Sequence, residues 1–203
     1  MRADAGPPLA DGYHSVAPGK LAAVVTSLQM HAAPAPRPEP ATGAWTLRHE
    51  TAPTAGWYRD LFARMGRDWL WFSRLAMDEA ALAAIIRDPA VEIHVLELDG
   101  QDQGYAELDF RRPGECELAF FAVDRDLQGT GAGRWLMNRA LERAWGRPIE
   151  RLWVHTCTLD HPGALAFYQR SGFVPYRRQV EIGDDPRVSG RLPHDPDTQA
   201  PLL

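Results

Sequence analysis

The stretch Val123-Asp124-Arg125-Asp126-Leu127-Gln128-Gly129-Thr130-Gly131-Ala132-Gly133-Arg134 decides the fold of this chain. An almost unbroken apolar run, residues 118–123, precedes it, and residues 135–145 follow it with helical spacing of apolar side chains. This order predicts a buried strand, a glycine-rich turn and a helix start. Glycines let a ligand approach the backbone closely, and the first amides of a helix favour an anion. We therefore expect phosphate binding by the glycine turn, which comprises Gln128, Gly129, Thr130, Gly131, Ala132, Gly133 and Arg134.

Composition narrows the class of protein. The 203 residues are 45% hydrophobic, which is enough for one substantial core. A net charge of −5 without a basic cluster argues against nucleic acid as a partner. No apolar run has transmembrane length, and the first residues lack the apolar segment of a signal peptide, so we expect no membrane partner. The only cysteines, Cys116 and Cys157, form no disulfide framework, which is typical of a cytoplasmic protein.

The chain divides into four predicted parts: a disordered N-terminal arm (1–19), an additional strand with a proline-rich connector (20–44), a folded domain (45–182) and a loose tail (183–203). The strand spans residues 20–30, and the connector carries four prolines in residues 31–41. Such a strand either pairs with a sheet edge of its own chain or is exchanged between two copies in a homodimer. The sequence leaves both arrangements open.

The folded domain alternates strand and helix patterns. Strands are predicted at 45–50, 91–98, 104–110, 116–123, 151–158 and 173–181, and helices at 57–65, 78–87, 135–145 and shortly after Pro162. Turn signals between the strands from 91 to 123 predict an antiparallel meander. The fold class is therefore α/β (α+β), with a mixed, mostly antiparallel sheet flanked by helices.

Two motifs carry a family resemblance. Gln128-x-x-Gly131-x-Gly133, directly after the strand ending at Val123, resembles the acetyl-CoA motif of the GNAT (GCN5-related) N-acetyltransferases. Further along, Ala164-Leu165-Ala166-Phe167-Tyr168-Gln169-Arg170-Ser171-Gly172-Phe173 resembles the second motif of that family. The resemblance covers residues 45–181 and implies an acyl-CoA N-acyltransferase-like fold. A dinucleotide-binding turn is a weaker alternative, because Arg134 stands where its third glycine belongs and a meander precedes it.

The resemblance implies roles for particular residues. The glycine turn would hold the CoA pyrophosphate, and Ala122 and Val123 would pair with the pantetheine arm and polarise the thioester carbonyl. The strand that contains them would diverge from strand 151–158 to admit the cofactor. Tyr168 would protonate the departing thiolate after direct attack by a neutral amine. The implied function is acetyl transfer from acetyl-CoA to a small amine or a protein amino group.

A general base has several candidates. Glu117 is the first choice, because it is the ionisable residue inside the central strand, where partial burial favours the neutral acid. Glu107, Asp109, His155 and water are the alternatives. A nucleophilic pair of His155 with Cys157 is less favoured, because nothing in the sequence orients the imidazole.

The position of the acids depends on hairpin register. A two-residue turn pairs Phe110 with Glu117, which places Glu107 on the opposite face. A three-residue turn pairs Asp109 with Ala119 and brings all three acids to one face. We favour the longer turn, because an unprimed Pro-Gly turn suits a two-residue hairpin poorly.

An aromatic cluster predicts the acceptor pocket. Trp69, Trp71 and Phe72 would form a wall with Arg74 at its lip, and Glu107 would add negative charge, which suits a cationic amine. The alternative is that the aromatics only complete the core. Histidine spacing predicts no metal site.

Two positions depart from the family pattern. His161 replaces a common asparagine, and Arg125 replaces a common proline. A non-catalytic acyl-CoA sensor and an enzyme with a longer acyl donor remain alternative functions.

Overall fold

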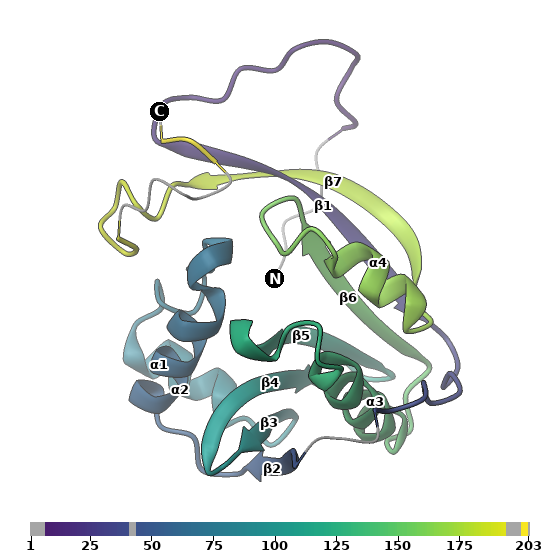
Figure 1. Ribbon diagram of the computed structural model, residues 1–203. Coiled ribbons are helices and arrows are strands. Elements are labelled where there is room, and N and C mark those ends of the chain that lie inside the picture. Colours follow the sequence, from purple (N-terminus) through teal and green to yellow (C-terminus); the bar gives the residue numbers. More distant parts are fainter. Residues whose placement is uncertain (1–6, 41–43, 194–199, 203) are drawn as a thin grey trace.

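A computed structural model describes residues 7–40, 44–193 and 200–202. One sheet of seven strands, in the order β2-β3-β4-β5-β6-β1-β7, carries helices on both faces (Figure 1). The strands are β1 (Lys20–Met30), β2 (Thr46–Glu50), β3 (Val91–Leu98), β4 (Gln101–Asp109), β5 (Glu115–Val123), β6 (Arg151–Cys157) and β7 (Val174–Asp184). The helices are α1 (Ala55–Gly66), α2 (Glu79–Ile86), α3 (Ala132–Trp145) and α4 (Ala164–Arg170), with short 3-10 turns η1 (Arg67–Trp69) and η2 (Arg125–Leu127). This mixed, mostly antiparallel sheet confirms the predicted fold class.

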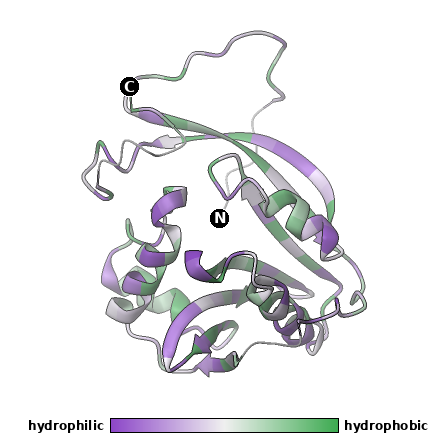
Figure 2. Ribbon diagram, viewed as in Figure 1, coloured by the Kyte–Doolittle hydropathy of each residue, from purple (hydrophilic) through white to green (hydrophobic). Residues whose placement is uncertain are grey.

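Two apolar cores lie on opposite faces of the sheet. Helices α1 and α2 cover one face, where Tyr58 and Phe62 pack against Val95 and Tyr105. Helices α3 and α4 cover the other face with a larger core that includes Leu136. Successive strand residues point to opposite faces, which is why β3 and β4 are buried on both sides. The hydropathy colouring shows green segments along the strands and on the inner sides of the helices (Figure 2).

Strand β1 forms at the residues that the sequence predicts. It pairs antiparallel with β6 on one side and with β7 on the other, as shown by Val25, which lies opposite both Cys157 and Gln179. The segment therefore lies inside the sheet of its own chain, with β7 as the edge strand. Without β1, the backbone groups of β6 and β7 along these edges would lack partners.

The tail is packed at its beginning instead of being loose throughout. Asp185 and Arg187 are buried and form an ion pair of 2.6 Å, and Arg187 also donates to the Ala200 carbonyl at 2.7 Å. Residues 194–199 lie outside the described part. Residues 7–19 contain no helix or strand and are almost entirely exposed. Among the described residues, no helix has the length and apolar character needed to cross a membrane.

Candidate active site

The glycine turn follows β5 through the short turn η2. Asp124 stabilises η2 by accepting a hydrogen bond from the Asp126 amide. Gly129 and Gly131 have φ of +78° and +98°, a region that side chains disfavour, so glycine is required there. The Thr130 hydroxyl donates to the Leu127 carbonyl at 2.7 Å and accepts from the Ala132 amide at 3.3 Å. The turn is thus held by its own side chains before any ligand binds.

The start of α3 offers free amides. Its first helical hydrogen bond joins the Trp135 amide to the Gly131 carbonyl at 3.0 Å, so the amides of Gly133 and Arg134 have no acceptor within the helix. Six residues of the glycine turn line a cavity of about 1100 Å³, namely Gln128, Gly129, Thr130, Gly131, Gly133 and Arg134. Ala132, which we grouped with them, is instead buried in the core beneath the turn.

The cavity continues into a gap between β5 and β6. The two strands pair in parallel only from Glu115 to Glu117, and the last pair joins Glu117 to Trp153. Beyond this point β5 stays paired with β4 as far as Val123 but turns away from β6 (Figure 1). The edge of β5 that faces the gap, including Ala122 and Val123, lines the cavity. The divergence implied by the family resemblance is therefore present.

The register between β4 and β5 differs from both predicted alternatives. Asp109 lies opposite Glu117, and Glu107 lies opposite Phe120, because a bulge at Ala119 adds one residue to β5. The connecting loop is also longer than either predicted turn. The three acids nevertheless share one face. Glu107 and Asp109 lie two residues apart on β4, and Glu117 lies directly opposite Asp109, before the bulge in β5.

Each of these acids has a partner. Glu107 is completely buried and accepts hydrogen bonds from Tyr58 and Arg74. Asp109 forms an ion pair of 2.5 Å with Arg111; burial raises the pKa of Asp109, but the Arg111 hydrogen bonds lower it below its ordinary value overall. Glu117 lies 3.6 Å from Nδ1 of His155.

These pairs change the expected character of the acceptor pocket. Two of the three carboxylates are paired with arginines, which weakens the negative charge expected to favour a cationic amine. Glu107 does not line the cavity, because it lies behind Arg74. The residue that we expected to attract the substrate is a buried partner of Arg74.

The aromatic wall does line the cavity. Trp69, Trp71, Phe72 and Arg74 all contribute to it. The Trp71 indole donates to Asp160 at 3.0 Å and packs against Phe120 with ring centroids 5.4 Å apart. The Arg74 guanidinium lies 5.1 Å from the centroid of the same Phe120 ring. The wall is therefore fixed both to the sheet and to the loop after β6.

Tyr168 reaches the cavity from the opposite face. Its ring packs edge-on against Phe173 with centroids 5.9 Å apart, and the residue is only 7% exposed. Burial, together with the nearby Asp160 carboxylate, raises the pKa of Tyr168 well above its ordinary value. The phenol therefore stays protonated at neutral pH and can donate a proton.

Asp160 is a residue that the sequence analysis did not single out. In the structure it accepts hydrogen bonds from the Thr156 hydroxyl at 2.7 Å and the Cys157 amide at 2.8 Å. Helix α4 is preceded by Gly163, whose amide donates to His161 Nδ1 at 2.9 Å. Asp160 thus joins the aromatic wall to the end of β6, a role that only the folded arrangement reveals.

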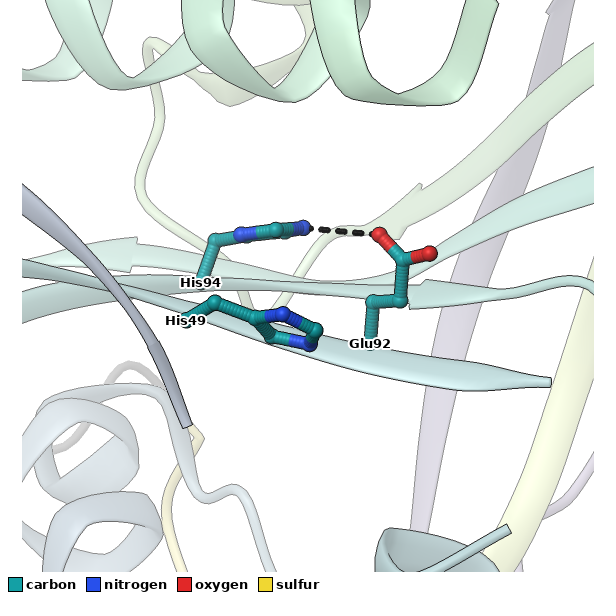
Figure 3. Close-up of side chains that lie close together, drawn as sticks. All are labelled: His49, Glu92 and His94. Carbon is teal, nitrogen blue, oxygen red and sulfur yellow. Dashed lines mark hydrogen bonds and ion pairs between the residues drawn. The ribbon is translucent and has the colours of Figure 1, made fainter. Parts of the chain in front are cut away.

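Three potential metal ligands gather elsewhere, in a group that histidine spacing did not predict. His49, Glu92 and His94 come together because His49 of β2 lies opposite His94 of β3, with Glu92 two residues away on the same face (Figure 3). Both Glu92 oxygens are engaged, one 2.9 Å from His94 and the other 2.9 Å from Arg147. The hydrogen bond with His94 lowers the pKa of Glu92. We interpret the group as a structural network that holds buried His94.

A bulged central strand that diverges from its neighbour and leads through a glycine turn into a helix is typical of acyl-CoA N-acyltransferase-like proteins. Residues 53–173 match the model of the acetyltransferase (GNAT) family, and the chain belongs to this family.

Individual relatives agree with this assignment. An uncharacterized N-acetyltransferase of Methanocaldococcus jannaschii is 34% identical over 87 residues, which cover 39% of this chain and 37% of that protein. A GNAT acetyltransferase of Elizabethkingia anophelis with acetyl-CoA bound has a TM-score of 0.52 and 19% identity, over 67% of this chain and 80% of that one. A GNAT-family protein of Novosphingobium aromaticivorans has a TM-score of 0.53 and 16% identity, over 84% and 71% of the two chains. These structures support the fold.

Proposed function

We propose that this chain transfers the acetyl group of acetyl-CoA to a primary amine, either a small molecule or a protein amino group. The observation that carries the proposal is the edge of β5 between residues 118 and 123. This edge lines the cavity without a pairing partner in β6. Backbone amides and carbonyls inside a protein need hydrogen-bond partners, and the two amides of a pantetheine arm can supply them.

The residues of the glycine turn suit the cofactor. Free amides of Gly133 and Arg134 at the start of α3 favour a pyrophosphate, and the absence of a side chain at Gly129, beside which no atom lies within 4 Å of the Cβ position, leaves the backbone open to it. The thioester supplies an activated acetyl group when acetyl-CoA is bound. Polarisation of its carbonyl would fall to backbone amides on the free edge of β5, between the Ala119 bulge and the Ala122–Val123 end of the strand.

Proton removal from the amine is assigned to Glu117. Its carboxylate lies where β5 and β6 separate, so it can reach a group in the gap, and it lines the cavity. His155, 3.6 Å from Glu117, would orient the carboxylate or receive the proton from it. General base catalysis requires this type of side chain within hydrogen-bond reach of the reacting amine.

Proton delivery to the leaving sulfur is assigned to Tyr168. Its raised pKa keeps the hydroxyl protonated, and it lines the same cavity. Burial and the neighbouring Asp160 raise the pKa of Cys157 to about 11, so this thiol is protonated at neutral pH. A protonated thiol is a poor nucleophile, which favours direct transfer over an acetyl-cysteine intermediate.

The acceptor pocket favours an amine with a flat apolar body. Its wall is aromatic, and the acids that share its face are paired with Arg74, Arg111 and His155. An amine with a ring can stack on Trp71 or Phe72, while a polyamine gains little from Glu107 and Asp109, which are already paired with arginines.

The experiment combines binding and turnover. Calorimetry with CoA comes first, followed by thiol release from acetyl-CoA with arylalkyl amines, aliphatic amines, polyamines and lysine peptides. The proposal expects binding of CoA and turnover that is highest with an arylalkyl amine. Binding without turnover of any amine would favour the acyl-CoA sensor, and turnover only with longer acyl donors would favour the other alternative. Failure to bind CoA would overturn the whole proposal.

A further inference from the structure

The proline-rich connector is docked on α3 instead of crossing open solvent. The amide side chain of Asn138 holds it, since its oxygen accepts from the Arg37 amide at 3.2 Å and its nitrogen donates to the Arg37 carbonyl at 2.8 Å. Glu39 adds a hydrogen bond with Asn138 at 2.9 Å and an ion pair with Arg139 at 2.8 Å. Both main-chain groups of Arg37 are thereby fixed, which leaves its side chain to project from a defined position.

Both glycine-containing motifs contact this connector. A Cβ atom added at Gly131 would lie 2.7 Å from Cγ of Pro40, and one added at Gly172 would lie 3.1 Å from Cβ of Pro34. Such distances are shorter than ordinary carbon contacts, so these glycines also make room for the connector. Docking at two separate motifs fixes the connector on both sides of Arg37, the connector residue that lines the rim of the cavity.

Three arginines meet at this rim. Arg37 lines the cavity together with Arg134 of the glycine turn and Arg170 of α4. Burial and then the charges of Arg134 and Arg170 lower the pKa of Arg37, which indicates that both cations lie close enough to repel Arg37. Within the described residues, no ion pair of 4.0 Å or less joins any of the three to an acidic side chain, because Glu39, the acid near Arg134, pairs with Arg139. Nε of Arg134 is buried without a partner. A cluster of like charges beside free helix amides is typical of an anion site.

We propose that Arg37, with Arg134 and Arg170, forms a site for a phosphate group of CoA, so that the connector is part of the cofactor site. This inference rests on the proposed function. The connector lies outside residues 53–173, the part that matches the family model. Guanidinium groups suit phosphate because their planar donors can bind two of its oxygens at once.

The test compares three acetyl donors in wild type, Arg37→Ala and Arg37→Lys. The donors are acetyl-CoA, acetyl-3′-dephospho-CoA and S-acetylpantetheine, which carries neither the pyrophosphate nor the 3′-phosphate. We expect Arg37→Ala to raise the KM of acetyl-CoA at least about tenfold with little change in kcat, because charge-assisted hydrogen bonds to phosphate are lost. The KM of Arg37→Lys for acetyl-CoA should lie between the values of wild type and Arg37→Ala. All three proteins should use S-acetylpantetheine with the same KM.

The dephospho donor identifies which phosphate is bound. If the effect of Arg37→Ala disappears with this donor, the site holds the 3′-phosphate; if it persists, the site holds the pyrophosphate. Both outcomes support the proposal. Arg178→Ala is the matched control, because Arg178 is exposed on β7 outside the cavity, and its KM values should equal those of wild type.

Two results would overturn the inference. One is an unchanged KM for acetyl-CoA in Arg37→Ala. The other is an equal loss of kcat/KM with acetyl-CoA and with S-acetylpantetheine in Arg37→Ala, which would mean that Arg37 only supports the fold. If wild type binds CoA and Arg37→Ala binds it equally well, this inference alone is wrong. If wild type binds no CoA, the proposed function is wrong as well.

Discussion

Glu117 and Trp153 form the last pair of the parallel ladder between β5 and β6, and the two strands separate beyond them. The pair places a carboxylate at the apex of the gap, while Tyr168 reaches the same cavity from α4 on the other face of the sheet. Under the proposed function, Glu117 as the base and Tyr168 as the acid would act on one bound thioester from opposite faces of the sheet.

Glu117→Gln should lower kcat by about 100-fold or more, because general base catalysis contributes factors of that order. The KM for acetyl-CoA should change little, since the substitution leaves the glycine turn intact. Steady-state thiol release as a function of pH is the measurement, and the acid limb of the rate profile should be lost. Glu115→Gln is the control, because Glu115 lies on the same strand but pairs with Arg151 outside the cavity. Equal activity of the two variants would exclude Glu117 as the base.

Tyr168→Phe should retain CoA affinity and lose most of kcat, since the substitution removes one hydroxyl and preserves the packed ring. A loss of about 10²-fold is expected for a proton donor. Calorimetry with CoA and single-turnover kinetics separate binding from chemistry. Unchanged turnover would leave Tyr168 with a packing role only.

Cys157→Ala should retain most of the activity, because the thiol is protonated at neutral pH. Burial and Asp160 raise the pKa of Cys157 from 9.0 to about 11. A thiol whose pKa is higher in the folded state contributes its full stability below the unfolded pKa of 9.0. This contribution is lost as the pH rises through the folded pKa of about 11. The free energy of unfolding of wild type, relative to Cys157→Ala, should therefore fall between pH 9 and 11. Rapid alkylation of the folded protein by iodoacetamide at pH 7.5 would contradict this assignment.

Glu107→Ala should destabilise the fold by about 3 kcal/mol, because it leaves the buried Arg74 without its ion-pair partner. Urea unfolding measures the change. The double variant Glu107→Leu with Arg74→Met should recover part of the loss, since no charge is then buried. Glu115→Ala provides the comparison, because its partly exposed pair with Arg151 should contribute less than about 1 kcal/mol. Equal losses in the two single variants would contradict a buried structural pair.

Deletion of residues 1–30 should prevent folding, whereas deletion of residues 1–19 should be tolerated. The longer deletion removes β1 from between β6 and β7, and the exposed strand edges would then promote aggregation. Thermal unfolding and size-exclusion chromatography of both truncated proteins make the comparison. A monomeric, folded product of the longer deletion would show that β1 is dispensable. An intact chain that dimerises in solution would reopen the exchange of this strand between copies.

Local patterns in the sequence were sufficient to predict the elements and the glycine turn. Strand and helix periods depend on neighbouring residues, and the left-handed backbone at Gly131 restricts the residue type at that position itself. The predicted segments 20–30 and 91–98 coincide with β1 and β3 for this reason.

The pairing of charges was decided by the tertiary structure. Glu107 meets Arg74 across the space between β4 and the segment before α2, and Asp109 lies opposite Glu117 only because a longer loop and the Ala119 bulge set the register. The position of β1 and the delivery of Arg37 to the cavity rim likewise depend on contacts between distant segments. The sequence by itself determined the residue types and local conformations of the proposed cofactor site. Tertiary structure decided which charges remain unpaired there, because that depends on distances between side chains that the linear order does not contain.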